Sequence, residues 1–107
     1  MRILVTALFA LLACVSALEA KTLGFTAAFP DERLRGKAYE LSDSDYTRAR
    51  AMGTVILEKN DELFGRNIDR SGDIETQIKR WNRLRAENNE RMDELGDFLR
   101  RNGTRVR

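Results

Sequence analysis

The sequence predicts an all-α protein, an antiparallel helical hairpin that follows a cleaved signal peptide and a partly disordered N-terminal arm. The chain begins with a short apolar run, and two later segments repeat apolar residues every three or four positions, as amphipathic helices do. A loop bounded by Gly65 and Gly72 separates these segments, so the two helices would run antiparallel. The predicted organisation is a signal peptide at 1–17, an arm at 18–43, the hairpin at 44–102 and a basic tail at 103–107.

The first residues have the features of a secretory signal. Arg2 supplies a positive start, residues 3–13 are apolar with one exception, and residues 15–17 offer short side chains to a signal peptidase. Cleavage is expected after Ala17 or, as the second choice, after Ala20. The apolar run is shorter than the roughly 20 residues of a membrane-spanning helix. The sequence therefore predicts a secreted, extracellular protein with no membrane span.

The single cysteine of the chain lies in this leader. Cys14 follows Leu11-Leu12-Ala13, and these four residues resemble the lipobox of bacterial lipoproteins, in which the cysteine carries the lipid. A bacterial lipoprotein anchored through Cys14 is therefore one alternative. After cleavage at Ala17, the mature chain of about 90 residues is long enough for one small core. It then has no cysteine and cannot form disulfides.

Composition excludes several chemistries. The chain has no histidine, which removes Ser–His and Cys–His nucleophile pairs and imidazole ligands for zinc. Carboxylate pairs remain, but the acidic residues lie at solvent-facing helical spacing. The formal net charge is only +2, and a near-neutral balance argues against a nucleic-acid partner. The sequence predicts a protein that is not an enzyme and that has no cofactor, no metal site and no nucleic-acid partner.

The arm contains Phe25, Phe29 and the only proline of the chain, Pro30. Proline suits the first position of a helix, and the two acidic residues that follow it favour a helix N-terminus. A short helix from Asp31 to Tyr39 is therefore expected within an otherwise flexible arm.

The first long helix is expected at 45–64. Ser44 is the expected N-cap, and Gly65 ends the helix. Gly53 should weaken the helix by about 1 kcal/mol relative to alanine unless a neighbour packs closely against it. The apolar stripe consists of Tyr46, Ala49, Met52, Gly53, Ile56, Leu57, Leu63 and Phe64.

The second helix is expected to follow an N-cap at Ser71 or Asp73 and to end before Gly103. Arg85 and Asn88 interrupt its apolar seam. They either set the register between associated helices or face water beyond the end of the partner helix. Because the first helix is the shorter one, the arm or a second copy must cover the remaining seam, so a homo-oligomer is one expectation. The seam consists of Ile74, Ile78, Trp81, Met92, Leu95 and Leu99.

The loop between the helices has oxygen-bearing side chains at alternate positions, and with Gly72 it resembles an EF-hand calcium loop. The twelfth position of that motif requires a bidentate glutamate, and Ile78 occupies it here. The other interpretation is a polar turn that caps the second helix, so no metal site is predicted. The oxygen-bearing residues are Asn67, Asp69, Ser71, Asp73 and Glu75.

Two features mark the surface of the second helix and the tail. Asn102-Gly103-Thr104 is an N-glycosylation sequon in an accessible position. Basic residues gather in the tail and around Trp81, where they either form a solvated face or contact an anionic lipid, a glycan or an acidic partner. They are Arg100, Arg101, Arg105 and Arg107 in the tail, and Lys79, Arg80, Arg83 and Arg85 around Trp81.

Together these features favour a small secreted protein-interaction module, such as a host-directed effector, a venom component or a reproductive or salivary secretion. Aromatic and flexible apolar side chains concentrate binding energy, so the predicted partner contacts are Trp81, Leu84, Met92 and Phe98. The alternative is a peptide-hormone precursor cut at basic sites such as Arg100-Arg101.

Overall fold

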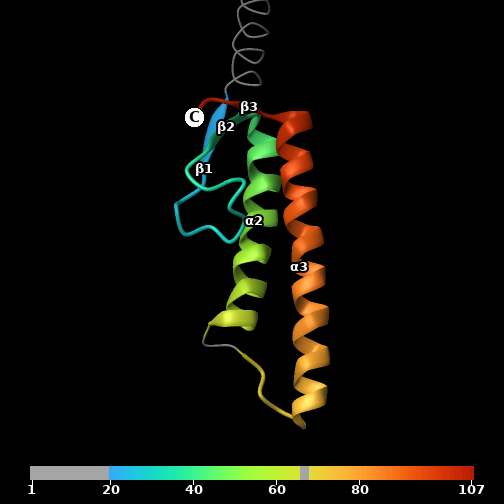
Figure 1. The fold of residues 1–107 in the computed structure, drawn as a ribbon. Helices are drawn as coiled ribbons and strands as arrows, with labels where there is room; N and C mark the ends of the chain where they lie inside the picture. The colour runs from blue at the N-terminus through green and yellow to red at the C-terminus, as the bar shows by residue number, and fades with distance from the viewer. Residues whose placement is uncertain (1–19, 66–67) are drawn as a thin grey trace, which may run out of the picture.

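The computed structural model describes residues 20–65 and 68–107. Two long helices run side by side, and a small sheet lies beside their upper ends (Figure 1). The predicted signal peptide, with Cys14 and the cleavage site after Ala17, lies outside the described residues, as does Asn67. The elements are β1 (Lys21–Gly24), β2 (Ala38–Leu41), α2 (Asp43–Phe64), α3 (Ile74–Asn102) and β3 (Thr104–Arg105).

The prediction of an all-α fold is wrong, because the predicted arm contributes two four-residue strands to a three-stranded antiparallel sheet. β1 pairs with β2 from Lys21 opposite Leu41 to Gly24 opposite Ala38. On its other edge β2 pairs with β3, where Tyr39 lies opposite Arg105. The sheet therefore joins the start of the described chain to its end, and the fold combines α-helices with a small β-sheet.

The short helix expected from Asp31 to Tyr39 is instead a turn followed by β2. The Asp31 carboxylate accepts a hydrogen bond from the backbone N–H of Arg33 at 3.0 Å, a local bond that competes with helix formation. Gly36 has φ +72°, which a glycine adopts without strain. Its N–H donates to the Phe25 carbonyl at 2.9 Å, so the chain returns to pair with β1 rather than continuing as a helix.

Helix α2 confirms the first predicted helix, with a different N-terminus. The N-cap is Ser42 rather than Ser44, and the Ser42 hydroxyl accepts a hydrogen bond from the Asp45 N–H at 3.3 Å. The acidic residues Asp43 and Asp45 lie in the first turn, where they complement the helix dipole. Gly65 ends the helix as predicted.

Helix α3 confirms the second predicted helix. Asp73 is its N-cap, and the Asp73 carboxylate accepts a hydrogen bond from the Thr76 N–H at 2.8 Å. The N–H of Gly103 donates to the Leu99 carbonyl at 2.8 Å, and the chain then enters β3. Within 20–65 and 68–107, neither helix is long and apolar enough to cross a membrane.

The hydrophobic core lies where the sheet and the turn pack against the helices. Phe25 and Phe29 meet edge to face, with ring centroids 4.8 Å apart, so the aromatic residues of the predicted arm are ordered core residues. Burial of each large apolar side chain stabilises the fold by roughly 1.5–3 kcal/mol. The core consists of Phe25, Phe29, Leu34, Tyr39, Leu41, Ala49, Ile56, Leu95, Phe98 and Leu99.

The two polar residues of the α3 seam have different surroundings. Asn88 is buried against α2, where its Nδ2 donates to the Ile56 carbonyl at 3.4 Å. Arg85 is exposed, with its guanidinium carbon 5.5 Å from the centroid of the Trp81 ring. Asn88 therefore lies between the two helices of the hairpin rather than in water, whereas Arg85 faces water.

Candidate functional site

A groove opens at the lower end of the hairpin, where α2 ends and α3 begins. It has a volume of about 450 Å³, and we call it the distal groove. Residues of both helices and of the loop line it: Lys59, Glu62, Ile68, Asp69, Ile74, Gln77, Ile78, Arg80, Trp81, Arg83 and Leu84.

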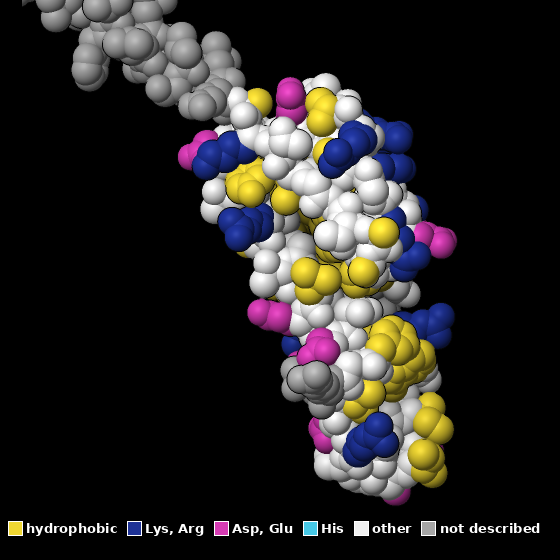
Figure 2. All heavy atoms as spheres, turned by 90° about the vertical axis from the view of Figure 1, so that its left-hand side faces the viewer, with side chains coloured by type: hydrophobic (Ala, Val, Ile, Leu, Met, Phe, Trp, Pro, Cys, Tyr) yellow, Lys and Arg dark blue, Asp and Glu magenta, His cyan; other side chains and the backbone are white. Residues whose placement is uncertain are grey.

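Large apolar side chains remain exposed at this end of the molecule. The exposed fractions are 71% for Ile74 and 53% for Ile78, both in the groove lining, and 63% for Phe64 at the end of α2. Figure 2 shows yellow hydrophobic side chains gathered along one edge of the lower half of the molecule. The sheet packs near the opposite end of the helices, so it does not cover these side chains (Figure 1). A group of exposed apolar residues of this kind is typical of an interaction site.

Trp81 is held in a fixed position at the wall of the groove. Its indole N–H donates to the Leu63 carbonyl at 3.1 Å, which bridges the two helices. Its ring meets Phe64 edge to face with centroids 5.8 Å apart, and the Arg85 guanidinium lies over it. Because these contacts fix the ring, the groove is a preformed surface, and a ligand would not have to order Trp81 on binding.

The rim of the groove carries charges of both signs. Arg80 forms an ion pair with Asp69 at 3.3 Å, and Lys59 pairs with Glu62 at 3.3 Å. Exposed pairs such as these add little to stability, but they place cations and carboxylates around an apolar centre. This arrangement resembles the polar rim and apolar core of protein–protein interfaces.

The predicted partner contacts fall into two groups. Trp81 and Leu84 line the distal groove. Met92 is half-buried against the core, and Phe98 is a buried core residue with the Arg48 guanidinium 5.1 Å from its ring centroid. The structure therefore does not bring the four residues to one surface, because two of them line the groove and the other two belong to the core or pack against it.

Sequence reasoning missed the exposed apolar residues Phe64, Ile74 and Ile78 as candidate contacts. The sequence did contain a signal for two of them, since Ile74 and Ile78 lie in the first turns of the longer helix. Helix α2 has 22 residues and α3 has 29, and the unequal lengths leave part of the α3 seam without a partner.

The loop that resembles an EF-hand uses its described oxygen atoms within the protein. Ser71 donates to Asp69 through both its N–H at 2.9 Å and its hydroxyl at 2.6 Å, and these bonds lower the pKa of Asp69. The hydrogen bonds from Thr76 likewise lower the pKa of the N-cap Asp73, while Glu75 pairs with Lys79 at 3.3 Å. Among the described residues, no group of three or more acidic, histidine or cysteine side chains could hold a metal ion.

Asn102, the residue of the glycosylation sequon, is exposed in the last turn of α3. Its Nδ2, the atom to which a glycan would be attached, donates to the Phe98 carbonyl at 3.0 Å. The side chain therefore lies along the end of the helix.

Comparison of the chain with protein-family models, with curated proteins and with solved structures finds no match.

Proposed function

We propose that this chain is a secreted, non-enzymatic protein-interaction module that binds an apolar segment of a partner protein in the distal groove. The observation that carries the proposal is the exposure of Phe64, Ile74 and Ile78 beside a groove whose wall is the fixed indole of Trp81. Covering one large apolar side chain is worth roughly 1.5–3 kcal/mol. Three such residues would supply a substantial part of the affinity of a partner.

The separation of the groove from the main core supports this proposal. The buried aromatic and aliphatic residues lie at the sheet end, around Phe29 and Leu95, and they stabilise the fold without the groove. The absence of histidine from the sequence supports a binding role rather than a catalytic one. Secretion rests on the leader at 1–17 and its expected cleavage after Ala17.

Site-specific photo-crosslinking tests the binding surface. A photoreactive benzoyl-phenylalanine placed at Ile78 should give one discrete adduct when the protein is incubated with the secreted fluid of its source. The same group at Glu90, an exposed position of α3 outside the groove lining, is the matched control and should give none. A second substitution, Ile74→Asp, should suppress the adduct at Ile78. Equal adducts at both positions, or none at Ile78, would refute the proposal.

The intact mass of protein recovered outside the cells tests secretion. A single species that begins at Leu18 supports a secreted folded module. Retention in the cells with the leader intact contradicts secretion, and a set of short fragments cut at basic residues contradicts a folded module.

A further inference from the structure

A second cavity, of about 400 Å³, lies at the opposite end of the molecule, and we call it the sheet-end cavity. Its walls come from the turn after Pro30, from β2, from β3 and from the last turns of α3. They consist of Asp31, Arg33, Leu34, Lys37, Tyr39, Gly96, Leu99, Arg100, Gly103 and Arg105.

Four of these lining residues are cationic and only one is anionic. Arg33 and Lys37 come from the turn, Arg100 from α3 and Arg105 from β3. In the space-filling view, dark-blue Lys and Arg side chains outnumber magenta ones on the upper part of the molecule (Figure 2). The fold therefore brings positive charges from three separate segments to one hollow.

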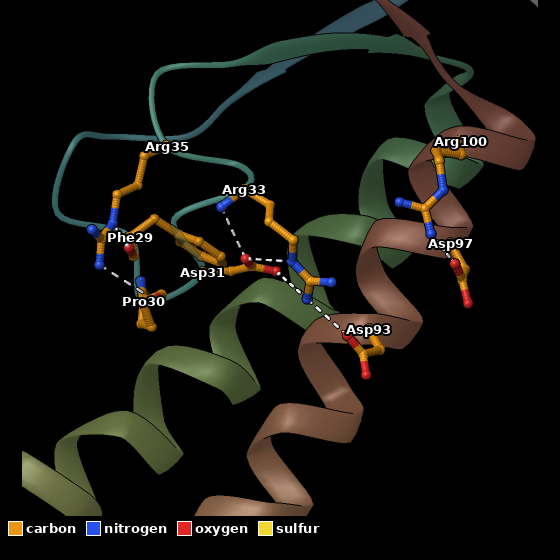
Figure 3. A network of polar contacts seen from close by, with 8 residues as sticks. All are labelled: Phe29, Pro30, Asp31, Arg33, Arg35, Asp93, Asp97 and Arg100. Atoms are coloured by element: carbon orange, nitrogen blue, oxygen red, sulfur yellow. Dashed lines mark hydrogen bonds and ion pairs between the residues drawn. The ribbon is translucent and has the colours of Figure 1, made fainter.

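The single carboxylate of the lining is already occupied. Asp31 accepts hydrogen bonds from the N–H, the Nε and the Nη2 of Arg33, each at 3.0 Å. The same Nη2 reaches Asp93 of α3 at 2.7 Å, so Arg33 links the turn to the helix (Figure 3). These carboxylates raise the pKa of Arg33. Arg33 and Asp31 neutralise each other and form one wall of the cavity.

The other cations keep donors for a ligand. Lys37 is half-buried and has no hydrogen bond or ion pair from its ammonium group among residues 20–65 and 68–107. Toward the described part of the chain, Arg105 uses only its Nε, which donates to the Arg107 carbonyl at 3.2 Å, so both terminal nitrogens keep their donors. Arg100 pairs with Asp97 through one terminal nitrogen (Figure 3).

Tyr39 contributes a hydroxyl group to the cavity lining. Its side chain is only 8% exposed and packs edge to face on Phe25, with centroids 6.4 Å apart, yet it lines the cavity. Within the described chain its hydroxyl has no hydrogen-bond partner. The hydroxyl oxygen is not fully buried, so it is accessible to solvent and to a ligand in the cavity. A hydroxyl beside Lys37 and Arg105 in one lining is suited to donate to an anionic oxygen.

The rest of the cavity is suited to an organic group. Leu34 and Leu99 lie behind the cavity wall and are only 4% and 0% exposed, and Gly96 contributes no side chain, which leaves space in the cavity. The volume falls within the range of roughly 300–1,000 Å³ that is usual for small-molecule sites, and a bare tetrahedral anion would fill only part of it.

We infer that the sheet-end cavity binds a small organic phosphate or sulfate ester, whose tetrahedral oxyanion is held by Lys37, Tyr39 and Arg105. Charge-assisted hydrogen bonds from guanidinium and ammonium groups to such oxyanions are short and strong. The organic part occupies the remaining volume of the cavity beside Gly96. This inference does not depend on the distal groove, which lies at the other end of α3.

Isothermal titration calorimetry on the full secreted chain at low salt tests the inference. The probes are glucose 6-phosphate, glucose 6-sulfate, inorganic phosphate and glucose. At least one ester should bind more tightly than inorganic phosphate, and glucose should not bind. Preference for the phosphate ester identifies the natural ligand as a phosphate, and preference for the sulfate ester identifies it as a sulfate.

Variants distinguish ester binding in this cavity from nonspecific attraction of an anion to the positively charged surface. Lys37→Ala and Tyr39→Phe should each weaken ester binding roughly tenfold, because each removes a hydrogen bond to a charged group. Gly96→Leu should abolish binding without changing any charge, since it adds a side chain to the cavity wall. The control Lys79→Ala removes an exposed cation at the other end of α3 and should leave binding unchanged. Circular dichroism checks that each variant is folded, and Tyr39→Phe keeps the ring that packs on Phe25.

Three results would overturn the inference. The first is that neither ester binds to the full chain. This includes the result in which the chain binds vesicles of phosphatidylserine and phosphatidylcholine but neither ester. The second is an equal loss of binding in Lys79→Ala and Lys37→Ala. The third is unchanged ester binding in folded Gly96→Leu or folded Tyr39→Phe.

Discussion

Asn88 offers a direct test of how the two helices hold together. It is 2% exposed, and its only hydrogen bond to the described residues is the 3.4 Å contact with the Ile56 carbonyl. Its Oδ1 is buried and has no hydrogen-bond partner within 20–65 and 68–107. Leucine has the same branching at Cγ and no polar atom, so we expect Asn88→Leu to stabilise the protein.

The size of the effect follows from three contributions. A buried acceptor without a partner costs about 1–3 kcal/mol. The hydrogen bond that is lost is long and lies at the weak end of the range, at about 0.5 kcal/mol. The slightly larger leucine costs up to about 1 kcal/mol in packing strain. The expected net gain of about 1 kcal/mol corresponds to an increase in Tm of roughly 4–8 °C for a domain of this size.

Thermal and urea unfolding, followed by circular dichroism, measure this change. Asn88→Ala is the matched control, because it also removes the amide but leaves a cavity, so it should be less stable than the leucine variant. Size-exclusion chromatography shows whether the leucine variant remains in the oligomeric state of the parent. If the folded Asn88→Leu variant is less stable than the parent by 1 kcal/mol or more, the reasoning is refuted. The Asn88 amide would then stabilise the contact between α2 and α3.

The remaining predictions concern helix glycines and helix caps. Gly53→Ala and Gly96→Ala should each stabilise the protein by roughly 0.5–1 kcal/mol in urea unfolding, because the added Cβ would lie 4.0 Å from Phe29 and 3.6 Å from Arg100, respectively. A loss of stability in either variant would show that the nearby packing does not accommodate a methyl group. The lowered pKa of the N-cap Asp73 gives stability that is present above its unfolded value of about 3.9 and is lost as the pH falls through the lower folded value. Asp73→Ser keeps a capping oxygen but does not titrate. The Tm of this variant should therefore fall less than that of the parent between pH 5 and strongly acidic solution. If both proteins lose Tm equally over this range, Asp73 does not contribute the pH-dependent stability.

The helices were predictable because their signals are local. The three- and four-residue periodicity continues for many turns, and the capping residues Asp73 and Gly103 directly flank α3. The sheet was not predictable on the same basis. β1 and β2 have four residues each and β3 has two, which is too short for an alternating pattern to be recognised. The pairing of Tyr39 with Arg105 also joins positions far apart in the sequence, which no local pattern reports.

The candidate sites were predictable only in part, for the same reason. The seam of α3 identified Trp81 and Leu84 but could not separate them from Phe98, because burial depends on tertiary packing that the spacing of apolar residues along one helix does not show. The sheet-end cavity requires Lys37 and Arg105 to be neighbours, and this follows from the pairing of β2 with β3. The basic residues of the tail were evident in the sequence, but the cavity that Arg100 and Arg105 line was not.

The position of the core relative to the two sites determines how substitutions should combine. Ile78 in the distal groove and Gly96 in the sheet-end cavity are separated along α3 by roughly 27 Å at 1.5 Å per residue. Core residues of α3 such as Leu95 and Leu99 lie toward the sheet end and pack against residues of the turn and of α2. Substitutions at sites this far apart that share no partners have additive effects on stability. A change that weakens one site should therefore leave the other intact, and a substitution that abolishes binding at both sites should act through the core.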